Sequence, residues 1–219
     1  MSKTHIYFMP GLAAGPEIFK KLTLDKECYD FHYLEWIEPL SLDETLPSYA
    51  YRMSELIKHS NIILIGVSFG GILVQEISKI INVKKLIIIS SVKSNQEFPN
   101  RIKLAKKSKV YKLFPTSIVT NFEDYAKYFI GKSLEKKAQI YKKYISVRGE
   151  TYLKWAIHNV VNWEQKEPFQ DILHIHGTKD SVFPIKHIKN SIEIEGGTHA
   201  MIIVKAKLIS NIIHKSLTC

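Results

Sequence analysis

The sequence predicts an α/β fold in which helices cover both faces of a mainly parallel sheet, and three observations support this. Short apolar runs alternate along the chain with segments whose apolar residues recur at helical spacing. The runs at residues 61–67 and 85–91 each contain an unbroken apolar stretch, as in parallel strands buried on both faces. A Gly-x-Ser-x-Gly turn at residues 66–70 connects one of these strands to a helical segment. In such sheets the reactive loops gather at the carboxyl ends of the strands.

Four elements precede the serine turn, and turn residues bound each of them. In chain order they are a strand at residues 4–9, a short helix at 16–22, a strand at 30–37 and a helix at 41–58. The loop at residues 10–15 is rich in small residues, so its backbone N–H groups can face a ligand. Pro39 closes the second strand.

The serine turn is the strongest functional signal. Gly66 and Gly70 flank Ser68, and a Cβ atom at either glycine is expected to collide with the neighbouring strand or helix. Ser68 then has a strained backbone and sits at a helix N-terminus, where free N–H groups and the helix dipole favour developing negative charge. Ser68 is the candidate nucleophile. The five-residue pattern alone is also typical of an ordinary strand-to-helix connection.

Residues 93–150 differ from the rest of the chain and predict a helical cap insertion. They carry 14 Lys and Arg against 5 Asp and Glu, which accounts for nearly all of the net charge of +10. Helices are expected at 101–113, 122–129 and 133–145. The aromatic residues of this segment either line an apolar pocket or, more commonly, pack the small helices together. The core domain is then residues 1–92 and 151–219.

After the insertion, the core elements resume and supply a candidate acid and base. The expected elements are a helix at residues 151–163, a strand at 171–177, an edge strand at 191–195 and a final helix at 200–216. Serine acyl transfer needs a base, and a carboxylate that fixes the imidazole tautomer. Asp180 follows the first of these strands, and His199 follows the second. The chain order Ser68, Asp180, His199 is the one expected for this kind of serine turn.

Each assignment has an ordinary alternative. Asp180 could be a turn or helix-capping residue, as Asp often is. His199 is one of nine histidines, and a single histidine is usually a surface or packing residue. His176 is the second candidate for the base, but its place at a strand end favours support of the loop backbone.

Composition limits the remaining possibilities. A chain of 219 residues with 45% hydrophobic content can bury a full core. Two cysteines, Cys28 and Cys219, give no disulfide framework and no metal-type spacing, which favours a reducing, cytoplasmic location. We expect no signal peptide, no membrane span, no metal site and no cofactor. The absence of base-stacking or groove-reading motifs argues against a nucleic-acid site, so the basic segment is expected to be a solvated surface.

Taken together, these motifs resemble the α/β-hydrolase fold over nearly the whole chain. The residues that carry the resemblance are Pro10-Gly11-Leu12, residues 66–71, residues 176–180 with Pro184, and residues 196–199. The resemblance implies a compact sheet of about six strands, a cap at residues 93–150, a structural turn at Gly11 and an oxyanion hole formed by the backbone N–H groups of Leu12 and Phe69. Two features depart from the family pattern. Pro10 stands where a histidine usually precedes the glycine, and the N-terminal antiparallel strands of the family are missing.

The resemblance implies a serine hydrolase that cleaves a carboxylic ester or related acyl bond of a small-molecule substrate. The same three residues also serve thioesterases, amidases, lactonases and carbon–carbon bond hydrolases. A basic cap could further bind an acidic carrier protein, as in methyl-ester hydrolases of biotin precursor synthesis. Two alternatives belong to other functional classes. The chain could be a non-catalytic binding protein with this fold, or its lysine-rich cap could bind nucleic acid or an anionic membrane.

Overall fold

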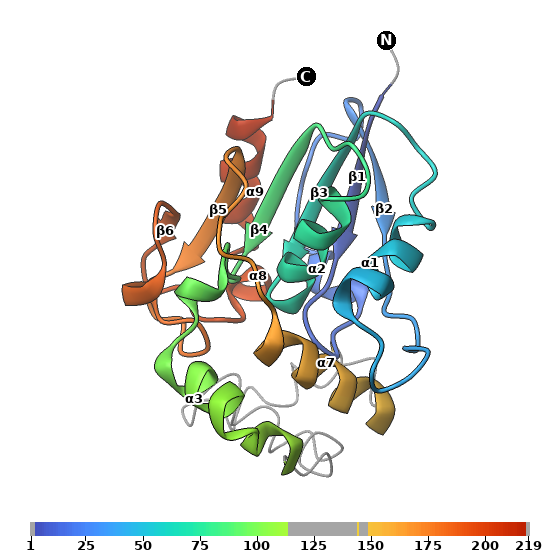
Figure 1. The fold of residues 1–219 in the computed structure, drawn as a ribbon. Helices are drawn as coiled ribbons and strands as arrows, with labels where there is room; N and C mark the ends of the chain where they lie inside the picture. Colours follow the sequence, from blue (N-terminus) through green and yellow to red (C-terminus); the bar gives the residue numbers. More distant parts are fainter. Residues whose placement is uncertain (1–2, 114–143, 145–148, 218–219) are drawn as a thin grey trace.

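A single six-stranded sheet forms the centre of the molecule (Figure 1). The computed structural model describes residues 3–113, 144 and 149–217. All strand pairs are parallel, and the strand order is β2-β1-β3-β4-β5-β6. The strands are β1 (Thr4–Met9), β2 (Tyr29–Tyr33), β3 (Ile62–Val67), β4 (Lys85–Ile89), β5 (Ile172–Gly177) and β6 (Ile192–Ile194). The expectation of a parallel sheet of about six strands is therefore confirmed.

Helices cover both faces of this sheet, as the apolar strands predicted. One face packs against α1 (Leu46–Ser54), α2 (Phe69–Ser78) and α7 (Glu150–Asn162). The other face packs against the 3-10 helix η1 (Pro16–Phe19), α8 (Met201–Val204) and α9 (Ala206–Ser216). All six residues of β3 are buried, because this strand is central and has an apolar layer on each side.

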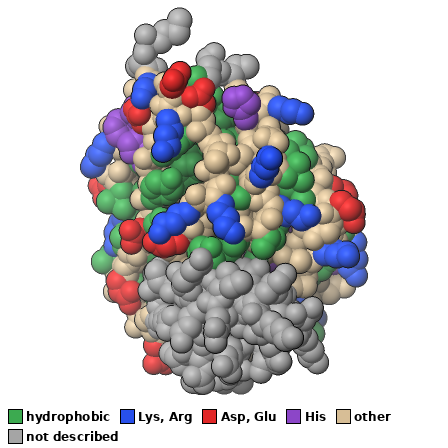
Figure 2. All heavy atoms as spheres, turned by 180° about the vertical axis from the view of Figure 1, so that it is seen from behind, with side chains coloured by type: hydrophobic (Ala, Val, Ile, Leu, Met, Phe, Trp, Pro, Cys, Tyr) green, Lys and Arg blue, Asp and Glu red, His purple; other side chains and the backbone are tan. Residues whose placement is uncertain are grey.

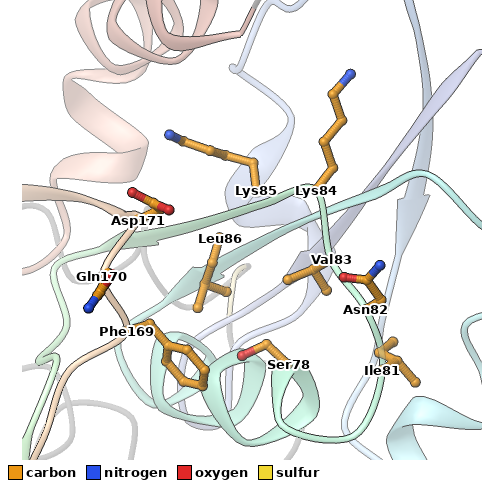
Figure 3. Close-up of a pocket in the computed structure, with 10 residues that line it drawn as sticks. All are labelled: Ser78, Ile81, Asn82, Val83, Lys84, Lys85, Leu86, Phe169, Gln170 and Asp171. Carbon is orange, nitrogen blue, oxygen red and sulfur yellow. The ribbon is translucent and has the colours of Figure 1, made fainter.

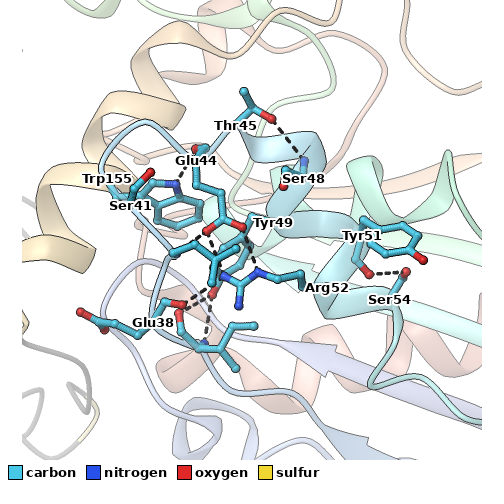
Figure 4. A network of polar contacts seen from close by, with 12 residues as sticks. Glu38, Ser41, Glu44, Thr45, Ser48, Tyr49, Tyr51, Arg52, Ser54 and Trp155 are labelled. Carbon is cyan, nitrogen blue, oxygen red and sulfur yellow. Dashed lines mark hydrogen bonds and ion pairs between the residues drawn. The ribbon is translucent and has the colours of Figure 1, made fainter.

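The segment before α1 is a loop, although the sequence predicted a helix from residue 41 (Figure 4). The helix begins at Leu46 because Pro47 fits the first turn and the Thr45 hydroxyl accepts a hydrogen bond from the Ser48 N–H at 3.3 Å. The buried Glu44 carboxylate instead binds the Arg52 guanidinium through two hydrogen bonds of 2.9 Å. This bidentate pair holds the loop against the helix.

Three other elements differ from expectation. The short helix near residue 16 is a single 3-10 turn, and the second strand ends at Tyr33 rather than at residue 37. The final helix is divided into α8 and α9, because Lys205 leaves the helical backbone conformation at φ −115° and ψ 19°. None of these differences alters the strand order.

Only part of the insertion at residues 93–150 is described. It contains the 3-10 turn η2 (Asn95–Glu97), α3 (Asn100–Ser108) and the 3-10 turn η3 (Val110–Leu113). These elements replace the single helix that the sequence predicted for residues 101–113, and a left-handed residue, Lys109 at φ 57°, separates α3 from η3. The helices expected at 122–129 and 133–145 lie outside the described residues, apart from Tyr144. The cap assignment therefore stays a prediction.

Basic side chains are dispersed over the described part of one face of the molecule. In the view from behind, Lys and Arg side chains are spread over the face, with Asp and Glu among them (Figure 2). None of the described helices combines the length and the apolarity that a membrane crossing requires. Cys28 is disulfide-bonded, so cysteine usage no longer favours a reducing compartment.

Candidate active site

The turn between β3 and α2 holds Ser68 in a strained backbone conformation. Its φ of 53° and ψ of −120° lie where side-chain-bearing residues are rare. A Cβ atom on Gly66 would collide with the backbone of Gly70 and Gly71, and one on Gly70 would collide with the carbonyl groups of Met9 and Pro10. Only glycine fits at these two positions, and the close approach of β1, β3 and α2 fixes the position of Ser68.

Three loops bring together the side chains that the sequence singled out. Ser68 follows β3, Asp180 follows β5 and His199 follows β6. Ser68 Oγ lies 2.9 Å from His199 Nε2, and His199 Nδ1 lies 2.9 Å from Asp180 Oδ2. An ionised carboxylate can only accept hydrogen bonds. The imidazole therefore donates its Nδ1 proton to Asp180, which leaves Nε2 to accept the Ser68 proton.

The Asp180 carboxylate is fully buried and well supplied with donors. Its Oδ1 accepts hydrogen bonds from the backbone N–H groups of Val182 at 2.8 Å and Phe183 at 2.9 Å. Burial by itself raises the pKa of this carboxyl group, but His199, His176 and the hydrogen bond from the Phe183 N–H together hold the pKa below its usual value. Asp180 is therefore ionised at neutral pH and can stabilise a positive charge on the His199 ring.

His176 supports the acid loop, as its position at a strand end suggested. Its Nε2 donates a hydrogen bond to the Phe183 carbonyl at 2.8 Å and lies 3.5 Å from Asp180 Oδ2. Burial lowers the pKa of His176 in spite of the nearby Asp180 charge. The side chain is thus held as a neutral ring beneath the carboxylate, and it does not contact Ser68 as a base would.

Two contributors to the site had no sequence signal. Arg101 of α3 donates hydrogen bonds from Nη2 to the carbonyl oxygens of Ser181 and Val182, at 2.5 and 2.7 Å. The Ser91 hydroxyl donates to the Ser68 carbonyl at 2.7 Å. Each contact joins segments that are far apart in the sequence, so no local sequence pattern predicts it.

The loop after β1 lies beside the serine. A Cβ atom on Gly11 would be 3.4 Å from Ser68 Cβ, and the Gly11 carbonyl accepts a hydrogen bond from Trp36 Nε1 at 2.9 Å. The Trp36 ring also stacks on Phe69, with ring centroids 4.9 Å apart. Trp36 therefore connects the two segments that carry the predicted oxyanion-hole residues, Leu12 and Phe69.

A separate pocket lies at the other end of the sheet (Figure 3). It has a volume of about 310 Å³ and is lined by residues 81–86 before and at the start of β4, by residues 169–171 before β5, and by Ser78. None of the three candidate catalytic residues lines it. We place the candidate active site at Ser68, because the convergent polar groups and the strained backbone are there.

Among the described residues, one group of side chains has the arrangement of metal ligands, and it consists of His5, His32 and His59. None of these histidines contacts Ser68, Asp180 or His199.

Comparisons with solved structures show the same overall arrangement in other proteins. A hydrolase from Pseudomonas aeruginosa PA01 matches with a TM-score of 0.74 and 11% identity, over 99% of this chain and 91% of that one. A bromoperoxidase from Bacillus anthracis matches with a TM-score of 0.70 and 16% identity, over 97% and 91%. A lipase-esterase related protein from Clostridium acetobutylicum matches with a TM-score of 0.66 and 17% identity, over 98% and 94%. No protein-family model and no curated protein sequence matches the chain.

Proposed function

We propose that this chain, which has the α/β-hydrolase fold, is a serine hydrolase that cleaves a carboxylic ester or a related acyl bond. The observation that carries the proposal is the continuous hydrogen-bond chain from Ser68 through His199 to the buried Asp180. A histidine between a hydroxyl group and an ionised carboxylate is arranged to act as a general base. The strained conformation of Ser68 and its place at the start of α2 add independent support.

In the proposed mechanism, Ser68 Oγ attacks the acyl carbon while His199 Nε2 takes the hydroxyl proton. The imidazolium formed in this step is stabilised by the Asp180 charge, which the backbone N–H groups of Val182 and Phe183 hold in place. His199 then gives the proton to the leaving group, so that an acyl-enzyme remains on Ser68. Water activated by His199 hydrolyses this intermediate and restores the serine.

The developing oxyanion needs donors close to Ser68. We propose the backbone N–H of Phe69, the first residue of α2, where the helix dipole adds to the attraction. The second proposed donor is the N–H of Leu12, the residue after Gly11, which lies against Ser68. The stacking and hydrogen bond of Trp36 would keep these two backbone segments at a fixed separation.

An acidic carrier protein as the source of the acyl group stays a prediction. The helix α3 carries four cations and no Asp or Glu. Three of the four already contact oxygen atoms of this chain, since Arg101 binds two carbonyl groups, Lys103 binds the Gln96 carbonyl and Lys106 binds Glu164. The described part of the insertion therefore gives the carrier hypothesis little further support, and we propose a small-molecule acyl substrate as the simpler partner.

Hydrolysis of p-nitrophenyl esters from acetate to decanoate, measured for wild type and Ser68→Ala, tests the proposal. We expect wild type to hydrolyse part of the series and Ser68→Ala to lose this activity. Ser78→Ala is the matched control, because this serine lies on the same helix but bonds only to the Gln75 carbonyl at 2.8 Å. Retention of activity in a folded Ser68→Ala variant would exclude the proposed nucleophile. Thioesters, amides and lactones in the same assay separate the other acyl bonds that these residues can cleave.

A folded wild type that cleaves no member of any series would favour the alternative of a non-catalytic binding protein. The chain would then retain the geometry of a hydrolase without its chemistry. Circular dichroism and a thermal melt of each variant establish that it is folded.

A further inference from the structure

Three histidines meet at the end of the sheet opposite Ser68. His5 is the second residue of β1, His32 is in β2, and His59 lies between α1 and β3. β1 pairs with β2 so that His5 is opposite Asp30 and Tyr7 is opposite His32. Side chains of paired residues in parallel strands point to the same face. Tyr7 packs into the core with α1, so His5, His32 and Asp30 point to the face where the chain leaves α1 and reaches His59.

The three rings are in direct contact. His5 Nδ1 lies 3.0 Å from His32 Nε2, and the rings of His5 and His59 stack with centroids 3.8 Å apart. One ligand nitrogen from each histidine can be chosen so that all three lie within 4.8 Å of one another. The histidines are far apart in the sequence, so their spacing gave no metal signal, and no metal site was expected from the sequence.

A carboxylate lies beside the three rings. Asp30 Oδ2 lies 3.9 Å from His5 Nδ1 and can serve as an oxygen ligand, since Lys3 contacts the other carboxylate oxygen, Oδ1, at 3.2 Å.

We propose that His5, His32 and His59 form a binding site for a divalent transition-metal ion such as Zn²⁺, with Asp30 as a fourth ligand. In a tetrahedral zinc site with Zn–N distances of about 2.0 to 2.1 Å, two ligand nitrogens are separated by roughly 3.3 Å. His5 Nδ1 and His32 Nε2 are already 3.0 Å apart, which is close to this separation. The ligand nitrogen of His59 lies within 4.8 Å of the other two, so the His59 ring moves closer when the ion binds all three.

Tyr7 gives the site an outer partner. Its hydroxyl group lies 2.6 Å from His59 Nδ1 and accepts a hydrogen bond from the Lys58 backbone N–H at 3.2 Å. The hydroxyl proton therefore points to His59 Nδ1, which leaves Nε2 of His59 for a metal ion. Hydrogen bonds of this kind orient metal-binding imidazoles in many proteins. A bound ion would join β1, β2 and the segment before β3, and it would act on stability rather than on hydrolysis.

Isothermal titration with Zn²⁺ and spectroscopy with Co²⁺, both on protein without an affinity tag, test the site. We expect one equivalent of metal, a higher melting temperature and the strong visible absorption of four-coordinate Co²⁺. His59→Gln, which changes an exposed ligand, and His32→Gln should each weaken binding by at least about tenfold. His214→Gln is the matched control, because this histidine is exposed on α9, and it should bind as wild type does.

Two outcomes would overturn the proposal. The first is wild-type protein that binds no metal in either experiment. The second is metal binding that is unchanged in His59→Gln and His32→Gln but lost in His199→Ala, which would place the ion at the candidate active site. Ester hydrolysis should be the same in wild type and His59→Gln, with or without one equivalent of Zn²⁺.

Discussion

The two ends of the parallel sheet each bring histidines together from distant segments, but they surround them differently. At the carboxyl end, His199 lies between a serine hydroxyl and a buried carboxylate, each 2.9 Å away. At the amino end, His5, His32 and His59 lie mainly against one another, and their nearest carboxylate, Asp30, is half exposed. A histidine beside a buried carboxylate suits the proposed general base, whereas three imidazole rings that lie together suit the proposed metal site. The neighbours of each histidine therefore decide which role we propose for it.

The largest expected effect tests the carboxylate at the carboxyl end. Asp180→Asn keeps an oxygen that can accept from Val182 and Phe183 but removes the negative charge. Without this charge the His199 ring loses its tautomer control and the stabilisation of its cationic form, so kcat should fall by about 10⁴-fold. Steady-state kinetics on the best p-nitrophenyl ester measure the change. A fall in kcat of less than about tenfold would show that the buried Asp180 charge contributes little to the role of His199, and would contradict the contrast drawn between the two ends of the sheet.

The second prediction concerns the close packing that holds Ser68. Gly66→Ala would place a Cβ atom against the backbone of Gly70 and Gly71, so the free energy of unfolding should fall by about 1 to 3 kcal/mol. Urea denaturation measures this loss. Gly149→Ala is the control, because the new Cβ would meet only the flexible Glu38 carboxylate, at 3.4 Å. Equal stability of the two variants would contradict the proposed packing of the serine turn.

The third prediction concerns pH and His174, a buried neighbour of His176. Burial, followed by the proximity of the His176 ring, lowers the pKa of His174 to about 3. The unfolded chain then binds more protons than the folded protein between the usual histidine pKa of about 6.5 and this lowered value. The free energy of unfolding should therefore decrease as the pH is lowered through this range, by up to about 1.4 kcal/mol for each pH unit.

Urea denaturation at pH 5, 6 and 7 measures this slope. The slope should be smaller in His174→Gln and unchanged in His214→Gln, whose side chain is exposed. A wild-type slope of zero, or one of opposite sign, would contradict the neutral state assigned to the histidines beneath Asp180.

The smallest effect is expected at Arg101, which tests whether the insertion supports the acid. Arg101→Met removes two hydrogen bonds to the loop after Asp180. Because Arg101 is exposed, the loss should be about 1 kcal/mol, which corresponds to a fall in kcat of roughly fivefold with little change in KM. Lys107→Met is the control, since this exposed residue is on the same helix. Equal kinetics for the two variants would remove Arg101 from the account.

The sheet and the serine turn could be predicted from the sequence because both depend on local patterns. Continuous apolar runs identify buried parallel strands, and Gly66, Ser68 and Gly70 stand at fixed spacing in one turn. The chain order then indicated which acid and base would lie near Ser68, because parallel strands place all their carboxyl ends at one edge.

Other features depend on contacts between distant segments and could not be predicted in this way. The loop before α1 is held against α7 by the hydrogen bond from Trp155 Nε1 to the Glu44 carbonyl, at 2.8 Å. The histidine cluster depends on the register of β1 against β2, since this register brings His32 to the face that His5 occupies. A pattern of residue types along the chain does not give the register of two strands.

Fluorophosphonate labelling of wild type and Ser68→Ala, followed by mass mapping of the modified peptide, tests the central claim most directly. The reagent requires a serine that a neighbouring base has activated, but it does not require the natural substrate. The account predicts one label per wild-type chain, attached to Ser68, and none in the variant. Labelling of a different residue, or a folded wild type that takes no label, would contradict the claim that His199 and Asp180 activate Ser68.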